Sequence, residues 1–413
     1  MKKLFFGAAA LLFSGAIFAQ NTSNSNQSGD DQRVYVRQAG TNLTSDVTQS
    51  NGSGLGSNKA AIWQYGDGSI ANVNQMGTNN QSWGYQEGDS QTSNVNQGLN
   101  NTASADNKAR TVQHNGAGNM STINQDGNLN EAYVHQDNET NTATVTQDGT
   151  GNSSATFQAY ELDSGSNNIA TVTQLGSGNQ EYSYQLGNGN VLTANQDGVD
   201  NKSDVVQTSP LTGVGNNALV NQFGERQNGR MRQTGDNNNG VFWQTGNDNI
   251  SELNQTGNNN FGYVSNQNSF NYARTDQEGD GNSATNWQYG GATNSKSYQR
   301  QIGDGNTIFT DQTNGDGNIA STYQDDNNYG TVHQTGGDNN QALLVQKSQG
   351  GLGHNAAIVQ NGTGNMANVL QLGPGGDFVN DAENCDFQQP ETLNCPSPLN
   401  DVVIDDPCPA PCI

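Results

Sequence analysis

Glutamine recurs along this chain at a spacing of about eleven residues. Twenty-nine glutamines between Gln38 and Gln371 fall on one series, and most steps are eleven residues long. Companion residues keep the same phase: Asn commonly stands six residues before the glutamine, Ala, Ser or Gly four before, an aliphatic residue two before, and Gly two after. A unit of this kind, NxAxVxQxG, predicts a stack of nearly identical structural elements.

The spacing inside the unit predicts strands. Asn, the small residue, the aliphatic residue and Gln are two positions apart, so one face of a strand carries all four. In the segment NTATVTQ the intervening residues Thr142, Thr144 and Thr146 face the other way. Short segments such as DGTG at 148–151 follow each glutamine, and Gly and Asn there favour a tight arc. Each unit is therefore interpreted as one strand and one arc.

These units predict an all-β fold, a β-solenoid with two strands per coil and two facing, parallel, in-register sheets. The series gives about 14 coils spaced about 4.8 Å apart. A three-sided solenoid is a lesser alternative, because a single type of arc recurs at every turn. Five longer steps keep the strand and lengthen the arc: Gln49 to Gln64, Gln97 to Gln113, Gln158 to Gln174, Gln207 to Gln222, and Gln346 to Gln360. With two strands per coil, the first two fall on one edge of the solenoid and the last three on the other.

Amides replace much of the usual apolar core. Only 30% of the residues are hydrophobic, whereas 64 are Asn and 41 are Gln. A buried amide without partners costs roughly 2–7 kcal/mol, but stacked amides can donate to and accept from the equivalent amide one coil away. The series begins at Gln38 and passes through Gln267 and Gln299. The residues predicted to form this structural ladder include Gln64, Gln75, Gln86, Gln125, Gln136, Gln147, Gln158, Gln174, Gln185, Gln196, Gln222, Gln233, Gln244, Gln255, Gln277, Gln288, Gln360 and Gln371, with Asn80, Asn130, Asn152, Asn179, Asn249, Asn282 and Asn365.

Both ends of the chain differ from the repeats. Residues 1–19 combine Lys2 and Lys3 with an apolar run that ends before Ala19, which is typical of a secretory signal peptide. Residues 20–31 are interpreted as a flexible polar leader, residues 32–373 as the solenoid, and residues 374–413 as an acidic, proline-rich tail. No segment is apolar for the roughly 20 residues that a transmembrane helix needs. The net charge of −24 disfavours nucleic acid as a partner.

The tail holds all four cysteines: Cys385, Cys395, Cys408 and Cys412. In an exported chain they predict two disulfides with three pairings open, intersubunit bonds included; a zinc site of four cysteines is the weaker alternative. We hypothesise that the tail caps or anchors the solenoid, because proline stops β-pairing.

No grouping of residues suggests catalysis. The histidines His114, His135, His333 and His354 are far apart in the sequence and are predicted to be surface residues. The GDGN segments resemble calcium-binding repeats, but those repeats have a period of nine residues, so turns are the preferred interpretation. We therefore expect no catalytic, cofactor-binding or metal-binding residues and no enzymatic activity.

The units resemble the curlin repeat, whose pattern contains QxGxxNxAxxxQ. The segment from Gln125 to Gln136, QDGNLNEAYVHQ, fits it at every position, as do the segments from Gln277 to Gln288 and from Gln360 to Gln371. The resemblance covers about residues 32–373. It implies a secreted bacterial subunit that leaves through an outer-membrane export pore and polymerises on the cell surface into amyloid fibres of the biofilm matrix, with a nucleator subunit as a further partner.

Self-assembly into such fibres, through edge-to-edge stacking of solenoids, is the function that these features favour. The alternative is a monomeric β-solenoid that serves as a surface adhesin or binding module. An ice-binding protein is disfavoured, because outward positions are too mixed for the regular Thr array that ice binding needs. In electron microscopy, filaments with an axial repeat of about 4.8 Å would favour the first function, and discrete rods would favour the second.

Overall fold

Short strands with alternating inward and outward residues follow one another, and the part of the chain that the structure describes has no helix between them. The computed structural model describes residues 20–51, 56–98, 104–160, 165–348 and 353–373. The predicted signal peptide and the tail with its four cysteines lie outside these residues. Among the described residues, the structure contains no helix long and apolar enough to span a lipid bilayer.

Within the described residues, thirty strands form two parallel sheets of fifteen strands each. The odd sheet consists of β1 (Thr22–Ser28), β3 (Thr44–Ser50), β5 (Ile70–Met76), β7 (Thr92–Gln97), β9 (Met120–Asn128), β11 (Thr142–Thr150), β13 (Ile169–Ser177), β15 (Val191–Val199), β17 (Asn217–Glu225), β19 (Asn239–Asn247), β21 (Phe261–Asn266), β23 (Ser283–Tyr289), β25 (Thr307–Thr313), β27 (Tyr329–Thr335) and β29 (Asn355–Asn361). The even sheet consists of β2 (Arg33–Thr41), β4 (Lys59–Asp67), β6 (Gln81–Asp89), β8 (Lys108–Ala117), β10 (Glu131–Asp137), β12 (Ser153–Gln158), β14 (Gln180–Leu186), β16 (Lys202–Thr208), β18 (Asn228–Thr234), β20 (Ile250–Thr256), β22 (Tyr272–Glu278), β24 (Lys296–Ile302), β26 (Ile319–Asp325), β28 (Gln341–Lys347) and β30 (Met366–Leu372).

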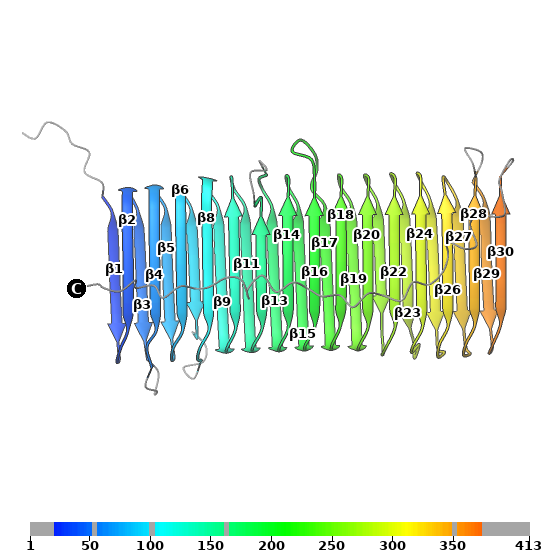
Figure 1. The fold of residues 1–413 in the computed structure, drawn as a ribbon, viewed down its shortest axis with the longest axis horizontal. Coiled ribbons are helices and arrows are strands. Elements are labelled where there is room, and N and C mark those ends of the chain that lie inside the picture. The colour runs from blue at the N-terminus through cyan, green and yellow to red at the C-terminus, as the bar shows by residue number, and fades with distance from the viewer. Residues whose placement is uncertain (1–19, 52–55, 99–103, 161–164, 349–352, 374–413) are drawn as a thin grey trace, which may run out of the picture.

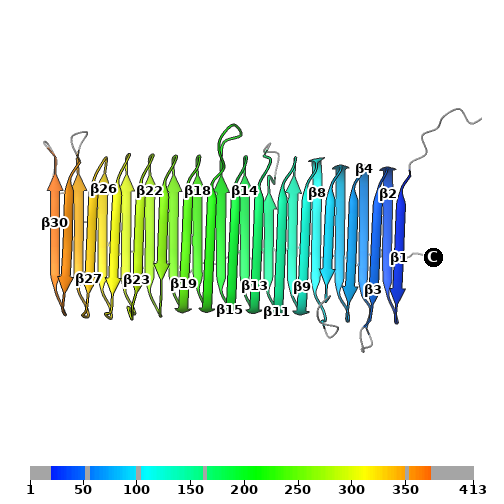
Figure 2. The same ribbon diagram turned by 180° about the vertical axis from the view of Figure 1, so that it is seen from behind.

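The chain winds as a long, regular solenoid. The strands follow one another in chain order from β1 at one end to β30 at the other, and arcs line both long edges (Figure 1). The reverse view shows the same order (Figure 2). Equivalent residues pair along each sheet, as in Val145 with Val172 and Gln147 with Gln174. The prediction of an all-β, two-sheet solenoid with in-register parallel strands is confirmed.

The described residues form 15 coils rather than about 14, because the solenoid begins before residue 32. Strand β1 pairs with β3 and places Gln27 beside Gln49. Residues 22–28 therefore form a strand within the segment that we expected to be a flexible leader. Asn21, Ser23 and Ser25 keep the spacing of the repeat, but Ser replaces the aliphatic residue, which hides the unit in the sequence.

Small and large residues of the two sheets face each other across the core. A Cβ added to Gly262, four before the ladder position of β21, would lie 2.5 Å from Leu253 Cδ1 of β20. A Cβ on Gly330 of β27 would lie 2.7 Å from Leu344 Cδ2 of β28. The small residue of one strand thus leaves space for the aliphatic residue of the facing strand, as dense packing requires.

The arcs stack as closely as the strands. Gly149 has a φ of +126°, and a Cβ there would lie 1.9 Å from the carbonyl oxygen of Gly176 in the next coil. Only glycine fits this combination of backbone conformation and close approach. The longer steps join β3 to β4 and β7 to β8 on one edge, and β12 to β13, β16 to β17 and β28 to β29 on the other. This confirms the predicted division of the insertions between the two edges.

Candidate functional site

The repeated glutamines form two hydrogen-bonded columns inside the solenoid. In the even sheet, Gln64 Nε2 donates to Gln86 Oε1 at 2.9 Å, and Gln86 Nε2 donates to Gln113 Oε1 at 2.9 Å. The same bond joins every pair of neighbours from Gln38 to Gln371, with distances of 2.7 to 3.3 Å. The even ladder is therefore continuous along the whole sheet.

Apart from Gln267 and Gln299 of the series, all the glutamines named above as ladder residues occupy these columns. In the even ladder are Gln64, Gln86, Gln136, Gln158, Gln185, Gln233, Gln255, Gln277 and Gln371. In the odd ladder are Gln75, Gln125, Gln147, Gln174, Gln196, Gln222, Gln244, Gln288 and Gln360. Those of the middle coils are almost completely buried.

Most ladder amides also tie the two sheets together. Gln75 Nε2 donates to the backbone oxygen of Lys59, at the start of β4, at 3.0 Å, and Gln86 Nε2 donates in the same way to Ile70 of β5. One N–H of the side chain therefore extends the ladder, while the other satisfies a carbonyl at the beginning of the preceding strand. Sequence reasoning missed this second bond, although the offset of 16 residues that most of these bonds share follows from the repeat length.

The asparagines form a different column, at the junction of arc and strand. Asn130 Oδ1 accepts the backbone N–H of Asn152 at 3.0 Å, and Asn130 Nδ2 donates to the carbonyl oxygens of Asp126 and Gly149. Asn80, Asn152, Asn179, Asn249 and Asn365 occupy equivalent positions before even strands, and Asn282 before an odd strand. The expected bond of amide to amide occurs in part of this column, as from Asn179 Nδ2 to Asn152 Oδ1 at 3.1 Å. The shorter Asn side chain also satisfies backbone groups of the arcs.

Two expected ladder residues are displaced. Asn266 rather than Gln267 pairs with Gln244 and Gln288. Asn266 lies eleven residues after Gln255, the usual step, and its side chain points inward. Gln267 is one residue further along the chain, so its side chain points outward. Gln301 rather than Gln299 pairs with Gln277 and Gln324.

Gln299 is also inward, two residues before the ladder position. It donates to Thr310 Oγ1 at 2.9 Å and accepts from Thr275 Oγ1 at 3.0 Å. The glycine two residues after the glutamine, Gly303, was the sequence signal that singles out Gln301.

One strand of the even sheet has a glutamate at the inward position, four residues before the ladder glutamine, that Ala, Ser or Gly usually occupies. Glu181 of β14 is buried, and Ser154 Oγ donates to its Oε2 at 2.8 Å. Burial raises the pKa of Glu181 to about 8, against the weaker lowering effect of hydrogen bonds from Ser154 and Ser183. The core is thus more stable when this side chain is neutral.

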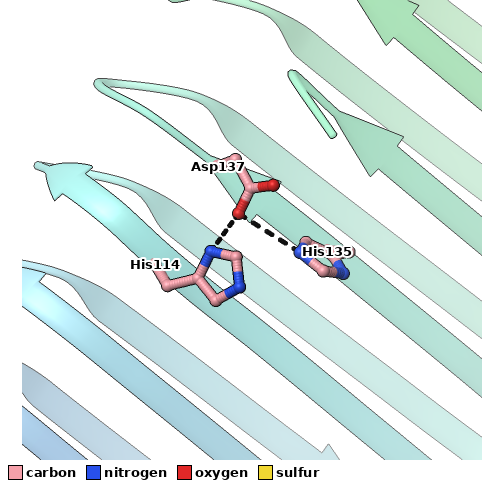
Figure 3. A group of neighbouring side chains, drawn as sticks. All are labelled: His114, His135 and Asp137. Carbon is pink, nitrogen blue, oxygen red and sulfur yellow. Dashed lines mark hydrogen bonds and ion pairs between the residues drawn. The ribbon is translucent and has the colours of Figure 1, made fainter. Parts of the chain in front are cut away.

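The prediction that the histidines are surface residues was wrong for His135, and two histidines that are far apart in the sequence lie side by side. The rings of His114 and His135 are 5.1 Å apart, and both approach the carboxylate of Asp137 (Figure 3). His135 is only 6% exposed. The missed signal is that His114 and Asp137 each follow a ladder glutamine, so in-register stacking of β8 and β10 brings them side by side.

The repeat is one that other proteins share. The family model described as the curlin associated repeat matches residues 139–176 and 229–257. These residues include parts of β11 to β13 and β18 to β20, where the ladder and the arcs follow the pattern described above. No curated protein matches the chain.

Proposed function

Because the chain carries curlin-associated repeats on a β-solenoid whose end strands lack a neighbour among the described strands, we propose that it is a structural subunit that assembles into curli-like amyloid fibres. The fibres would lie outside the bacterial cell, in the biofilm matrix or on the surface, where they serve adhesion. Export through an outer-membrane pore and a nucleator subunit belong to the same proposal. The activity is self-association rather than catalysis.

The hydrogen-bonding groups at the two ends are complementary. Gln27 and Gln38 begin the two columns, so no preceding ladder amide donates to their Oε1 atoms. Gln360 and Gln371 end the columns, and each spends one N–H on a backbone carbonyl, at 2.8 and 3.0 Å. Within the described solenoid, no later ladder amide accepts their second N–H groups, whereas one coil earlier Gln334 and Gln346 donate theirs to Gln360 and Gln371. This is the observation that carries the proposal.

Head-to-tail stacking would continue both ladders without a change of register. Strand β29 of one subunit would pair with β1 of the next, and β30 with β2, which keeps odd strands on odd and even on even. Head-to-head contact would instead bring donor against donor. A heterologous contact of this kind does not close on itself and therefore generates a fibre.

A proline at the open edge tests this assignment. In a parallel ladder, successive N–H groups point to alternate neighbours. The backbone N–H of Thr44 donates to Ser69 O in the next coil. The N–H groups that lie an even number of residues further along the same strand therefore also point toward the next coil. By this rule the N–H of Val359 in β29 points out of the last odd strand.

We expect Val359→Pro to fold as the wild type does, with an unchanged circular dichroism spectrum, but to abolish elongation followed by thioflavin fluorescence. The control is His333→Pro, at the same position of β27, where the proline removes an internal bond and should disrupt the fold itself. Unimpaired fibre growth by folded Val359→Pro, or a wild-type chain that stays monomeric for days at high concentration, would refute the proposed function.

A further inference from the structure

One cluster on the outside of the even sheet lies apart from both glutamine ladders. His114 of β8 and Asp137 of β10 are paired in register, one residue after their ladder glutamines. His135 lies two residues before Asp137 on the same strand and therefore on the same face. Figure 3 shows both imidazole rings directed at one carboxylate. Two neighbouring coils thus supply three side chains to one point.

The three groups are close enough to share an ion. His114 Nδ1, His135 Nε2 and an oxygen of Asp137 all lie within 4.8 Å of one another, and His135 Nε2 is 3.2 Å from Asp137 Oδ1. A Zn²⁺ ion about 2.0–2.2 Å from each ligand holds such atoms roughly 3–4 Å apart. Rotations of side chains suffice to reach that geometry, because the two strands are already fixed in register by the sheet.

The surroundings orient these groups and shield two of them from bulk solvent. His135 and Asp137 are 6% and 5% exposed. Tyr133 Oη lies 2.9 Å from His135 Nδ1, which leaves Nε2 directed at Asp137. The ring of Tyr160 packs edge-on against His135 at 4.6 Å. In many metal sites, one nitrogen of a ligating histidine is hydrogen-bonded to a second group, which fixes the other nitrogen as the ligand, and apolar side chains surround the ligands. Tyr133 and Tyr160 provide these two features for His135.

We propose that His114, His135 and Asp137 bind a divalent transition-metal ion, for which Zn²⁺ is the best chemical match. Two imidazoles and one carboxylate form a donor set that zinc accepts, with its fourth position left to water. Ca²⁺ and Mg²⁺ prefer six or more oxygen ligands, which this cluster does not offer. When the ion binds, Nδ1–H of His135 donates to Tyr133 Oη, while Nε2 uses its lone pair for the metal.

The ion would connect two consecutive coils of the even sheet. Because it contacts β8 and β10 at once, it binds only when these strands are in register. Binding that requires the folded stack stabilises the fold by mass action. The site lies on the outward face, so it remains accessible in a fibre that grows from the ends of the solenoid.

Titration of the full chain with ZnCl₂, followed by isothermal calorimetry, tests the proposal. We expect one Zn²⁺ per chain with a dissociation constant in the micromolar range or below. His114→Ala and Asp137→Asn should each weaken binding at least tenfold. The matched control is His333→Ala: His333 Nδ1 lies 3.5 Å from Asp311 Oδ2, a pair with a single histidine, and its loss should leave the affinity unchanged.

The spectroscopic signature separates this site from adventitious binding. Zinc X-ray absorption should show two histidine nitrogens together with oxygen ligands, and this pattern should disappear in Asp137→Asn. If a variant changes the circular dichroism spectrum, His114→Asn replaces it, because His114 is more exposed than its two partners. Absence of stoichiometric binding, or equal affinity in the wild type, His114→Asn and Asp137→Asn, would overturn the proposal.

Discussion

Asn266 marks a fault in the odd ladder, and it shows what a single methylene contributes to this core. Its Nδ2 reaches the carbonyl oxygen of Ile250 at 2.9 Å, as a ladder glutamine would. Asn266 Oδ1 and Gln288 Oε1, both buried, have no hydrogen-bond partner within the described structure. Elsewhere the bonds to the neighbouring glutamines occupy these oxygens. The interruption is a consequence of the shorter side chain.

Lengthening this side chain should repair the ladder. Asn266→Gln adds one methylene and allows bonds to Gln244 and Gln288, each contributing about 1 kcal/mol. We expect the free energy of unfolding to rise by about 1–2 kcal/mol, measured from the guanidinium midpoint by circular dichroism. Asn266→Leu serves as the control, since it fills the space without the bonds. Equal stabilisation by leucine would show that volume, not hydrogen bonding, limits this position.

Glu181 makes the stability of the core depend on pH. Its folded-state pKa, about 8, exceeds the ordinary value of 4.5 for an exposed glutamate. The folded state therefore binds the proton more tightly, and this contribution is fully present below pH 4.5 and is lost as pH rises through 8. At about 1.4 kcal/mol per pKa unit, the loss is of the order of 5 kcal/mol.

The variant Glu181→Gln should remove this dependence, because glutamine stays neutral. We expect its stability relative to the wild type to increase between pH 5 and pH 8, as measured by guanidinium midpoints at each pH. The matched control is Glu131→Gln, whose carboxylate is partly exposed and pairs with Lys108. If the difference between Glu181→Gln and the wild type were constant over this range, the buried carboxyl would not be the titrating group.

Among the elements, strands were easier to predict than the contacts between them. The period-two pattern ending in Gln-x-Gly located nearly all strands and the edges that carry the insertions. It did not locate β1, where serines replace the aliphatic residue, or decide between Asn266 and Gln267. Leu253 packs against Gly262 because of how far one sheet is shifted along the strand direction relative to the other. The spacing of residues within one strand does not contain information about that shift between the sheets.

The arcs give a matched pair of substitutions within one turn. Gly149 and Gly151 both have positive φ, but a Cβ on Gly149 would meet the backbone of Gly176 at 1.9 Å, whereas a Cβ on Gly151 meets nothing within 4 Å. Gly151→Ala should cost about 1–2 kcal/mol of backbone strain. Gly149→Ala should cost considerably more, because neighbouring coils must separate. Equal guanidinium midpoints for the two variants would contradict close stacking of the arcs.

At the scale of the molecule, the same repeat produces the core, the closure of each coil and the two open ends. Side-chain ladders run the length of the solenoid, so every coil contacts chiefly its neighbours, and stability accumulates coil by coil. The glutamine side chains donate to and accept from their neighbours in interior coils. At the two ends of the solenoid the same side chains leave an N–H donor at one end and an oxygen acceptor at the other. The metal cluster could not be read from the sequence as long as its residues were judged by their separation along the chain. Register alone brings His114 beside Asp137.

Cryo-electron microscopy of fibres grown from the purified full chain tests head-to-tail stacking most directly. The account predicts polar fibres in which rungs are about 4.8 Å apart and 15 coils make up each subunit. At the junction, Gln360 and Gln371 should lie next to Gln27 and Gln38 of the following subunit, with all strands parallel. Discrete rods of one subunit, or fibres in which neighbouring subunits run in opposite directions, would contradict it.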